Sequence, residues 1–208
     1  MSGERPGRRF RVLDRRRVHE GFYQLDVLEL QHERFDGGWT GPLRRELLVQ
    51  RRAVAVLPYD PEQDLVVLVE QFRTGCIDQA AGEPWLIEAV AGLVEDGETA
   101  EQVAEREVRE ETGLAIGRLE HACRYHASPG GTSEQVQVFV AEIQAGAAGG
   151  VHGVAHEDED IRTHVLPAEQ AFAMVADGRI IAANGVIPIL WLQLHRERLR
   201  RAWARAAV

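Results

Sequence analysis

Hydrophobic and polar positions alternate near the start of the chain, as they do in a strand with one buried face. Residues 23–30 show this period of two over most of their length. The turn signal Asp36-Gly37-Gly38 follows, and residues 45–50 then have the composition of a returning strand. Residues 9–49 are therefore predicted to be rich in antiparallel β-structure.

Apolar runs without alternation follow this segment. The runs at residues 53–57 and 65–70 are continuous, which is typical of strands buried on both faces, and a turn at residues 58–61 joins them. A short run at residues 85–90 and a further run at residues 136–143 predict two more strands. The residues after the last run, as far as Gly153, are mostly small and are expected to form a loop.

Three segments have helical patterns. The clearest covers residues 99–112, with a Thr–Gln capping box at its start and Gly113 as its stop signal. Residues 168–177 and 186–205 are also predicted to be helical, and the second of these is amphipathic. Strand runs interspersed with isolated helices indicate an α+β fold or mixed α/β layers.

Composition and charge narrow the functional classes. With 208 residues, 45% of them hydrophobic, the chain can bury the core of one domain with an appendage. Its net charge of −9 argues against a nucleic-acid partner. No apolar run reaches the length of a membrane span, and the arginine-rich N-terminus lacks the apolar core of a signal peptide. Two distant cysteines, Cys76 and Cys123, suit the reducing cytoplasm.

Three carboxylates share one face near the end of the clearest helix. Glu107, Glu110 and Glu111 stand at i, i+3 and i+4, next to the negative end of the helix dipole. Like charges repel there, and a bound hard cation such as Mg²⁺ or Mn²⁺ would offset the repulsion. The alternative is a solvated helix face with ordinary salt bridges, such as one between Glu105 and Arg109.

The segment around these carboxylates resembles the Nudix box, a loop-helix-loop motif of fixed spacing. Every constrained position of the motif is met: Gly92, Glu98, Arg106, Glu107, Val108, Glu110, Glu111, Gly113 and Leu114. The resemblance implies hydrolysis of a nucleoside diphosphate linked to another group. It implies that Glu107 and Glu111 bind the metal ions and that Glu110 is a further ligand. The remaining polar and glycine positions, namely Gly92, Glu98, Arg106 and Gly113, are expected to hold the motif in shape.

Over nearly its whole length the chain is similar to ADP-ribose pyrophosphatases. In that group the backbone carbonyl matching Ala91 contacts a metal ion, and the arginine matching Arg73 reaches the substrate, since a guanidinium suits a diphosphate. The other positions that match substrate contacts are Phe22 and Tyr23 beside adenine, Arg45 and Glu46 over the substrate, the loop residues Ser128, Pro129 and Gly130, and Glu134 at a ribose. Core packing is the alternative for the two aromatic residues, and a surface position at a strand end is the alternative for Arg73.

An acidic segment at residues 156–160 matches a loop that carries further chemistry in the similar enzymes. By position, Glu157 matches the general base and Glu159 matches an additional metal ligand. Neighbouring acids leave the register of these two roles open by one or two residues, so Asp158 is an alternative base.

The resemblance also implies a fold and partners. The expected fold is α+β, with an α/β/α Nudix sandwich around a mixed sheet at residues 51–208 and an antiparallel β-sheet subdomain at residues 1–50. Similar enzymes exchange that subdomain, so a domain-swapped homodimer is expected. Two or more Mg²⁺ ions per site, with Mn²⁺ as a substitute, would serve the conversion of ADP-ribose to AMP and ribose 5-phosphate. The alternatives are another nucleotide sugar, such as GDP-mannose or ADP-glucose, and a sensor that binds ADP-ribose without hydrolysis.

Overall fold

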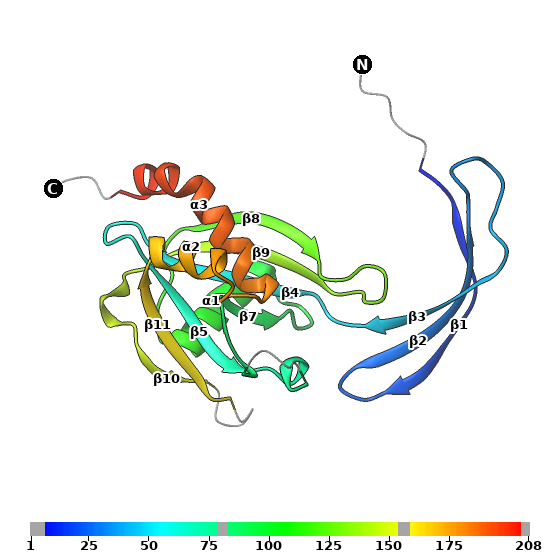
Figure 1. The fold of residues 1–208 in the computed structure, drawn as a ribbon, viewed down its shortest axis with the longest axis horizontal. Helices are drawn as coiled ribbons and strands as arrows, with labels where there is room; N and C mark the ends of the chain where they lie inside the picture. Colours follow the sequence, from blue (N-terminus) through cyan, green and yellow to red (C-terminus); the bar gives the residue numbers. More distant parts are fainter. Residues whose placement is uncertain (1–6, 79–82, 154–158, 205–208) are drawn as a thin grey trace, which may run out of the picture. The chain divides into compact units, whose positions relative to one another are not determined.

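The computed structural model describes residues 7–78, 83–153 and 159–204. The chain forms two compact units. The first comprises Met1–Arg51 together with His126–Glu134, and the second comprises Arg52–Tyr125 together with Gln135–Val208. Figure 1 labels the helices and strands of both units. A segment distant in sequence therefore belongs with the N-terminal strands.

The first unit is built on a three-stranded antiparallel sheet of β1 (Phe10–Glu20), β2 (Gln24–His32) and β3 (Leu43–Val49), in that order. The strands predicted at residues 23–30 and 45–50 are confirmed as β2 and β3. The glycine turn between them is also confirmed, because Gly37 and Gly38 adopt φ values of 96° and 73°.

β1 was not predicted as a separate strand, because its run of arginines hides the alternation. Two of those arginines have an evident structural role. The carboxylate of Asp26 in β2 is only 1% exposed. It accepts hydrogen bonds of 2.7 Å from Nε of Arg15 and from Nε of Arg17. The arginines of β1 therefore neutralise an acid that the sheet buries.

The second unit contains an eight-stranded mixed sheet, whose main path has the order β10-β11-β5-β4-β9-β8. Two short strands lie off this path, β6 pairing with β5 and β7 pairing with β4. β4 pairs with β9 in parallel and with β5 and β7 antiparallel. The strands are β4 (Ala53–Asp60), β5 (Leu65–Phe72), β6 (Trp85–Glu88), β7 (Val90–Leu93), β8 (Leu119–His126), β9 (Gln135–Glu142), β10 (Gly150–His152) and β11 (Ile161–Pro167).

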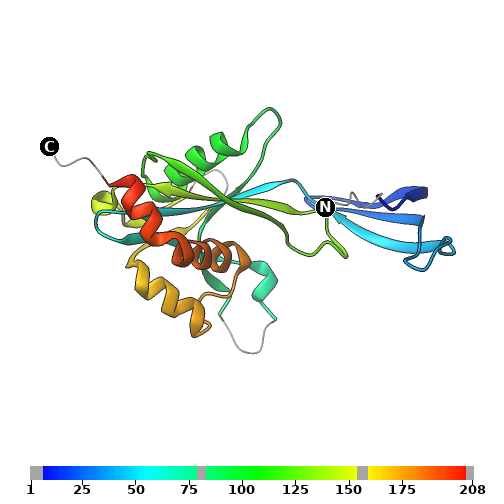
Figure 2. The same ribbon diagram turned by 90° about the horizontal axis from the view of Figure 1, so that it is seen from above.

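Helices cover both faces of this sheet, as Figure 2 shows. On one face, Val54 and Val56 of β4 pack in a buried cluster with α1 (Ala100–Thr112). On the other face, Leu57 and Tyr59 pack with α2 (Ala168–Ala176) and α3 (Ala183–Trp203). The continuous apolar composition of β4 and β5 is explained by this double burial. The α/β/α sandwich with a mixed sheet is thereby confirmed.

Some elements differ from the sequence prediction. The single strand expected at residues 85–90 is in fact two strands, β6 and β7, which Ala89 separates. They pair with different neighbours. The loop expected before Gly153 contains a short 3-10 helix, Ala145–Ala147, and the edge strand β10. A second 3-10 helix, Thr74–Cys76, follows β5. These pieces are too short to impose a period on the sequence.

Two strands, β8 and β11, were not predicted, because each is only partly buried and lacks a continuous apolar run. The last helix begins at Ala183 rather than at residue 186, and it includes Pro188. Its predicted apolar side is confirmed, since Ile189, Leu192 and Leu199 are fully buried. Within the described part of the chain, no helix has both the length and the apolar character needed to cross a membrane.

The helix α1 has both of its predicted ends. The Thr99 hydroxyl accepts a hydrogen bond from the Gln102 backbone, and the Gln102 side chain accepts one from the Thr99 backbone. At the other end, Gly113 has a φ of 70° and its N–H donates to the Arg109 carbonyl at 2.9 Å. These caps fix the point at which α1 stops, directly after Glu111 and Thr112.

Replacing Gly113 by alanine is expected to lower the melting temperature by about 2–8 °C. A left-handed alanine costs about 1–2 kcal/mol, and each kcal/mol shifts the midpoint by about 2–4 °C in a chain of this size. The new Cβ would also lie 3.2 Å from Cε1 of His152. Thermal unfolding should be compared with Gly75→Ala, since a Cβ at Gly75 would have nothing within 4 Å. Equal midpoints for the two variants would contradict this account of the helix end.

Candidate active site

The most buried acid of the predicted site is Glu111, in the last turn of α1. Glu111 is 2% exposed, and its Oε2 has no hydrogen-bond partner among the residues that the structure describes. Burial raises the pKa of Glu111 well above its usual range, and the nearby charges of Glu107 and Glu159 raise it further. Arg73 and a hydrogen bond from the Ala91 backbone act in the opposite direction. A buried oxygen without a partner is costly unless a cation binds it.

Glu107 lies one helical turn before Glu111 and packs against β7. Burial is the main cause that raises the pKa of Glu107 to about 7. The side chain occupies the space beside Gly92, where an added Cβ would come within 1.7 Å of Glu107 Oε1. Gly92 is therefore required because the carboxylate fills the place of its side chain.

Arg106 connects the loop and the helix of the motif. Its Nε donates to Glu98 Oε1 at 3.0 Å. Its Nη1 donates to Glu107 Oε1 at 2.7 Å and to Glu110 Oε2 at 3.1 Å. Its Nη2 also reaches the Leu93 carbonyl at 3.4 Å. These contacts are the kind that hold the motif in shape, and they give Glu98 a partner at the end of the loop, directly before α1.

The donors of this site suit a hard divalent cation. They are carboxylate oxygens, the ligand type that Mg²⁺ and Mn²⁺ prefer. The Ala91 backbone also lies beside Glu111, to which its N–H donates a hydrogen bond. Within the described residues, no three side chains of His, Cys, Asp or Glu converge as a ligand group. Arg106 instead engages Glu107 and Glu110. The carboxylates still lie within electrostatic reach of each other, and the unpartnered Glu111 oxygen fits a cation.

Arg73 follows β5 and forms an ion pair that the sequence did not reveal. Its Nε and Nη2 each lie 2.7 Å from Glu88 Oε2. The residue Glu88 is only 4% exposed, whereas the Arg73 side chain is 38% exposed. The buried Glu88 carboxylate thus fixes the Arg73 guanidinium, while part of the Arg73 side chain stays accessible to solvent. The signal in the sequence was a charged residue at the end of the apolar strand β6.

Part of the acidic segment lies within the described residues. Glu159 raises the pKa of both Glu107 and Glu111, so its carboxylate lies near both. This is the place that a further metal ligand would need. The proposed base Glu157 and its alternative Asp158 lie outside the described residues.

The aromatic residues matched to adenine contacts are in the first unit. Phe22 is 85% exposed and Tyr23 is 49% exposed, and their rings meet edge to face with centroids 4.9 Å apart. Core packing within this chain therefore does not account for either residue. Exposed aromatic side chains of this kind are available to a ligand or a partner.

Arg45 and Glu46 are exposed neighbours on β3 of the first unit. They do not pair with each other in the contacts that the structure gives. Arg45 Nη1 donates to the Arg44 carbonyl at 2.8 Å. Glu46 lies 3.7 Å from Arg44 Nη2, which is a weak surface ion pair. Both side chains can therefore be redirected at little cost.

The loop with the predicted substrate contacts is fastened to β3. The Leu48 N–H donates to the Gly131 carbonyl at 2.8 Å, and the Ser133 N–H donates to the Leu48 carbonyl at 3.0 Å. The Thr132 hydroxyl contacts the side chain of Gln50 and accepts from the Glu134 N–H at 3.1 Å. The remaining predicted contacts of this loop, Ser128, Pro129 and Gly130, are exposed. The loop is therefore held in the first unit by its bonds to β3 and to Gln50.

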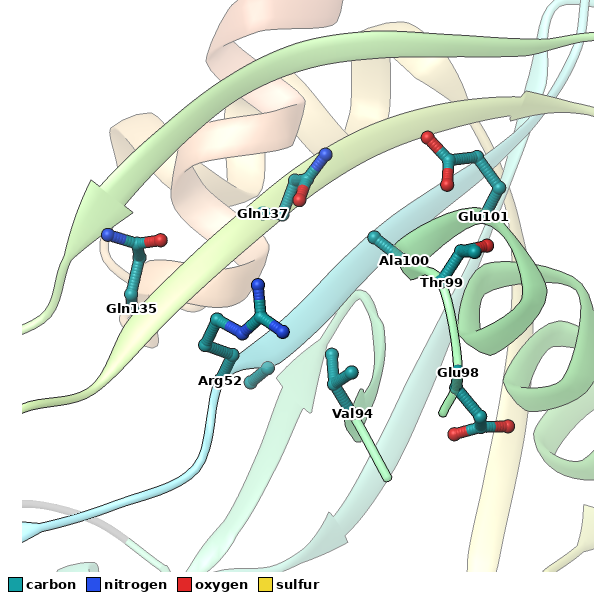
Figure 3. Close-up of a pocket in the computed structure, with 9 residues that line it drawn as sticks. Arg52, Val94, Glu98, Thr99, Ala100, Glu101, Gln135 and Gln137 are labelled. Atoms are coloured by element: carbon teal, nitrogen blue, oxygen red, sulfur yellow. The ribbon is translucent and has the colours of Figure 1, made fainter. Parts of the chain in front are cut away.

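A pocket of about 170 Å³ opens beside the start of α1 in the second unit. Figure 3 shows that its lining comes from the ends of β4, β7 and β9 and from the first turn of the helix. Glu98 is the one predicted site residue among its lining, and Arg106 already engages that carboxylate. The lining does not include Glu107 or Glu111. The pocket is therefore separate from the predicted metal site.

Several proteins with similar sequences are named as pyrophosphatases. The chain is 44% identical over 193 residues to the ADP-ribose pyrophosphatase of Escherichia coli (strain K12), covering 93% of this chain and 92% of that protein. It is 41% identical over 197 residues to the ADP-ribose pyrophosphatase of Haemophilus influenzae, covering 94% and 91%. A GDP-mannose pyrophosphatase of Enterobacter sp. (strain 638) is 36% identical over 155 residues, covering 73% and 78%.

The fold and the domain match agree with these relatives. A crystal structure of an ADP compounds hydrolase superposes with a TM-score of 0.70 and covers 98% of this chain and 100% of that one, at 19% identity. At that identity the likeness concerns the fold alone. Residues 49–184 match the NUDIX domain. Since this match spans more than half of the chain and includes the whole of the carboxylate-bearing motif, the chain belongs to the NUDIX family.

Proposed function

We propose that this chain hydrolyses the pyrophosphate bond of ADP-ribose to give AMP and ribose 5-phosphate. Its 44% identity to an ADP-ribose pyrophosphatase extends over 93% of the chain, whereas the match to a GDP-mannose pyrophosphatase is 36% over 73%. The assignment as a hydrolase rests on the NUDIX family, and the nucleotide-sugar substrate rests on what the similar proteins are named for. The choice of ADP-ribose rests on the closer and longer match.

The observation that carries the proposal is the buried carboxylate pair at the end of α1. Glu111 has a buried oxygen without a partner among the described residues, and Glu107 is held against Gly92 beside it. Two acids with raised pKa values at a helix C-terminus are unfavourable for folding alone. We propose that Glu107, Glu111, Glu159 and the Ala91 carbonyl bind two or more Mg²⁺ ions, with Mn²⁺ as a substitute. Glu110 is proposed as a further ligand at the edge of this site.

The proposed mechanism assigns separate tasks to the residues of the chain. The bound cations would offset phosphate charge and lower the pKa of a water molecule. Glu157 takes a proton from the attacking water as general base, and one oxygen–phosphorus bond forms while the bridging bond breaks. Arg73, held by Glu88, donates to the diphosphate and keeps it in line for attack.

We propose that the residues of the first unit recognise the nucleotide and the ribose. Phe22 and Tyr23 offer exposed rings to adenine, and Glu134 offers its carboxylate to a ribose hydroxyl.

The first unit has large exposed apolar side chains, including Phe10 at 72% and Phe35 at 87%, which supports a homodimer that covers them. Light scattering should give twice the mass of one chain, and a monomer mass at micromolar concentration would refute the dimer. Two free cysteines are consistent with a cytoplasmic enzyme.

Fast release of AMP from ADP-ribose is expected in the presence of Mg²⁺, with slower release of nucleoside monophosphate from ADP-glucose and GDP-mannose. A chelator should abolish all three reactions, because the site consists of carboxylates that need cations to accept a diphosphate. Chromatographic quantitation of the products under one set of conditions is the measurement. Preference for GDP-mannose would reassign the substrate within the same family, and binding of ADP-ribose without turnover would favour the sensor.

Replacing Glu107 or Glu111 by glutamine is expected to lower kcat by more than about a hundredfold, since even residues behind metal ligands cost about 10–100-fold. The fold should survive, because the substitution removes a buried charge and keeps the shape. Glu105→Gln is the matched control on the same helix, since the Glu105 side chain is 59% exposed and pairs with Arg109. Near-normal kcat in both site variants, with wild-type unfolding curves, would exclude these residues as metal ligands.

Glu157→Gln is expected to lower kcat while leaving the half-saturating Mg²⁺ concentration within about twofold, because a base acts on the water and not on the cations. The same measurement on Asp158→Asn is the matched control for the register. A large loss in Asp158→Asn together with a small loss in Glu157→Gln would move the base to Asp158.

A further inference from the structure

Two backbone segments approach unusually closely at the loop end of the hairpin formed by β10 and β11. Gly153 has a φ of 116°, a conformation that residues with side chains rarely adopt. A Cβ on Gly153 would lie 2.7 Å from the Glu159 carbonyl oxygen, 2.8 Å from Glu159 Cβ and 3.0 Å from its carbonyl carbon. The obstruction is main chain on the Glu159 side, so it cannot move aside as the tip of a flexible side chain could.

The position of this contact follows from the pairing of the hairpin. β10 and β11 are antiparallel, and His152 is the partner of Ile161 at the end of the ladder. Gly153 is the next residue after β10, and Glu159 is two residues before β11. The contact therefore closes the hairpin just beyond its last paired residues.

Both strands of the hairpin are also attached to elements that carry the proposed site. On the β10 side, His152 packs against Gly113 at the end of α1, so that an added Gly113 Cβ would meet His152 Cε1 at 3.2 Å. On the β11 side, the acid at the end of β5 holds two side chains. Glu70 Oε2 lies 2.9 Å from His164 Nε2 and 3.5 Å from Arg162 Nη1. α1 therefore contacts β10, and β5 holds β11 through Glu70.

The residue held by the contact is Glu159, which the proposed function makes a metal ligand beside Glu107 and Glu111. Both strands of its hairpin, β10 and β11, lie against α1, the helix that carries Glu107 and Glu111. The Glu159 side chain starts from a Cβ and a backbone that Gly153 confines.

We propose that Gly153 is a positioning residue, which sets the Glu159 carboxylate against Glu107 and Glu111 for divalent-cation binding by confining the Glu159 main chain. This inference rests on the metal site of the proposed function. It assigns a role to Gly153 that lies outside the NUDIX motif at residues 92–114, and it makes the closed end of the hairpin part of the cation affinity. No reacting group of the substrate needs to contact Gly153.

Direct binding of Mn²⁺ tests this role without substrate. Free Mn²⁺ is measured by electron paramagnetic resonance in titrations of the wild type, Gly153→Ala and Gly149→Ala. Gly149 is the matched control, because it adopts a φ of 139° just before β10 while a Cβ there would meet nothing within 4 Å. Gly153→Ala is expected to raise the Kd for Mn²⁺ by about tenfold, as loss of an outer-shell partner does, and Gly149→Ala should change it less than about twofold.

A double-mutant cycle with Glu159→Gln separates positioning from a general loss of stability. If Gly153 acts through Glu159, Gly153→Ala should add no further increase in Kd once Glu159 has become glutamine. Equal Mn²⁺ affinity in the wild type and Gly153→Ala, or additive effects in the double variant, would overturn the inference and leave the proposed function intact. Absence of Mn²⁺ binding by the wild type would overturn both. Thermal unfolding of each variant shows that the protein measured is folded.

Discussion

The burial of carboxylates at the end of α1 is the constraint on which the rest of the second unit depends. An ionised acid removed from water is costly unless other charges compensate it. Glu111 and Glu107 are placed there together, with raised pKa values, where the helix dipole adds to the cost. The sheet and the capped helix hold these acids in place despite their repulsion. Affinity for divalent cations is the expected product of that strain.

The surrounding arginines divide the task of limiting this repulsion. Arg106 touches the acids directly and connects Glu107, Glu110 and Glu98. Arg73 acts from a greater distance, because its guanidinium is fixed by Glu88 while it still lowers the pKa of Glu111. A cation of the proposed function would compete with Arg106 for the Glu107 carboxylate, whereas the Arg73–Glu88 pair involves none of the proposed metal ligands.

The sequence allowed the fold class and the central helix to be predicted, because both depend on local patterns. Double burial of β4 is visible as a continuous apolar run, and the ends of α1 are visible as Thr99 and Gly113. The partly exposed strands β8 and β11 could not be predicted, because their pairing depends on distant neighbours. In the same way Glu88 could be recognised only when its contact with Arg73 was known, and Gly153 only when its approach to Glu159 was known.

The packing of Glu107 into the space beside Gly92 has a consequence for how such sequences can change. A side chain at position 92 and a glutamate at position 107 would compete for the same volume. A side chain at position 92 therefore cannot be accepted while the glutamate at position 107 is kept. A descendant that has lost hydrolysis and shortened residue 107 is released from this exclusion, and its position 92 becomes free to drift. A glycine at 92 is thus a record of continued use of the carboxylate opposite it.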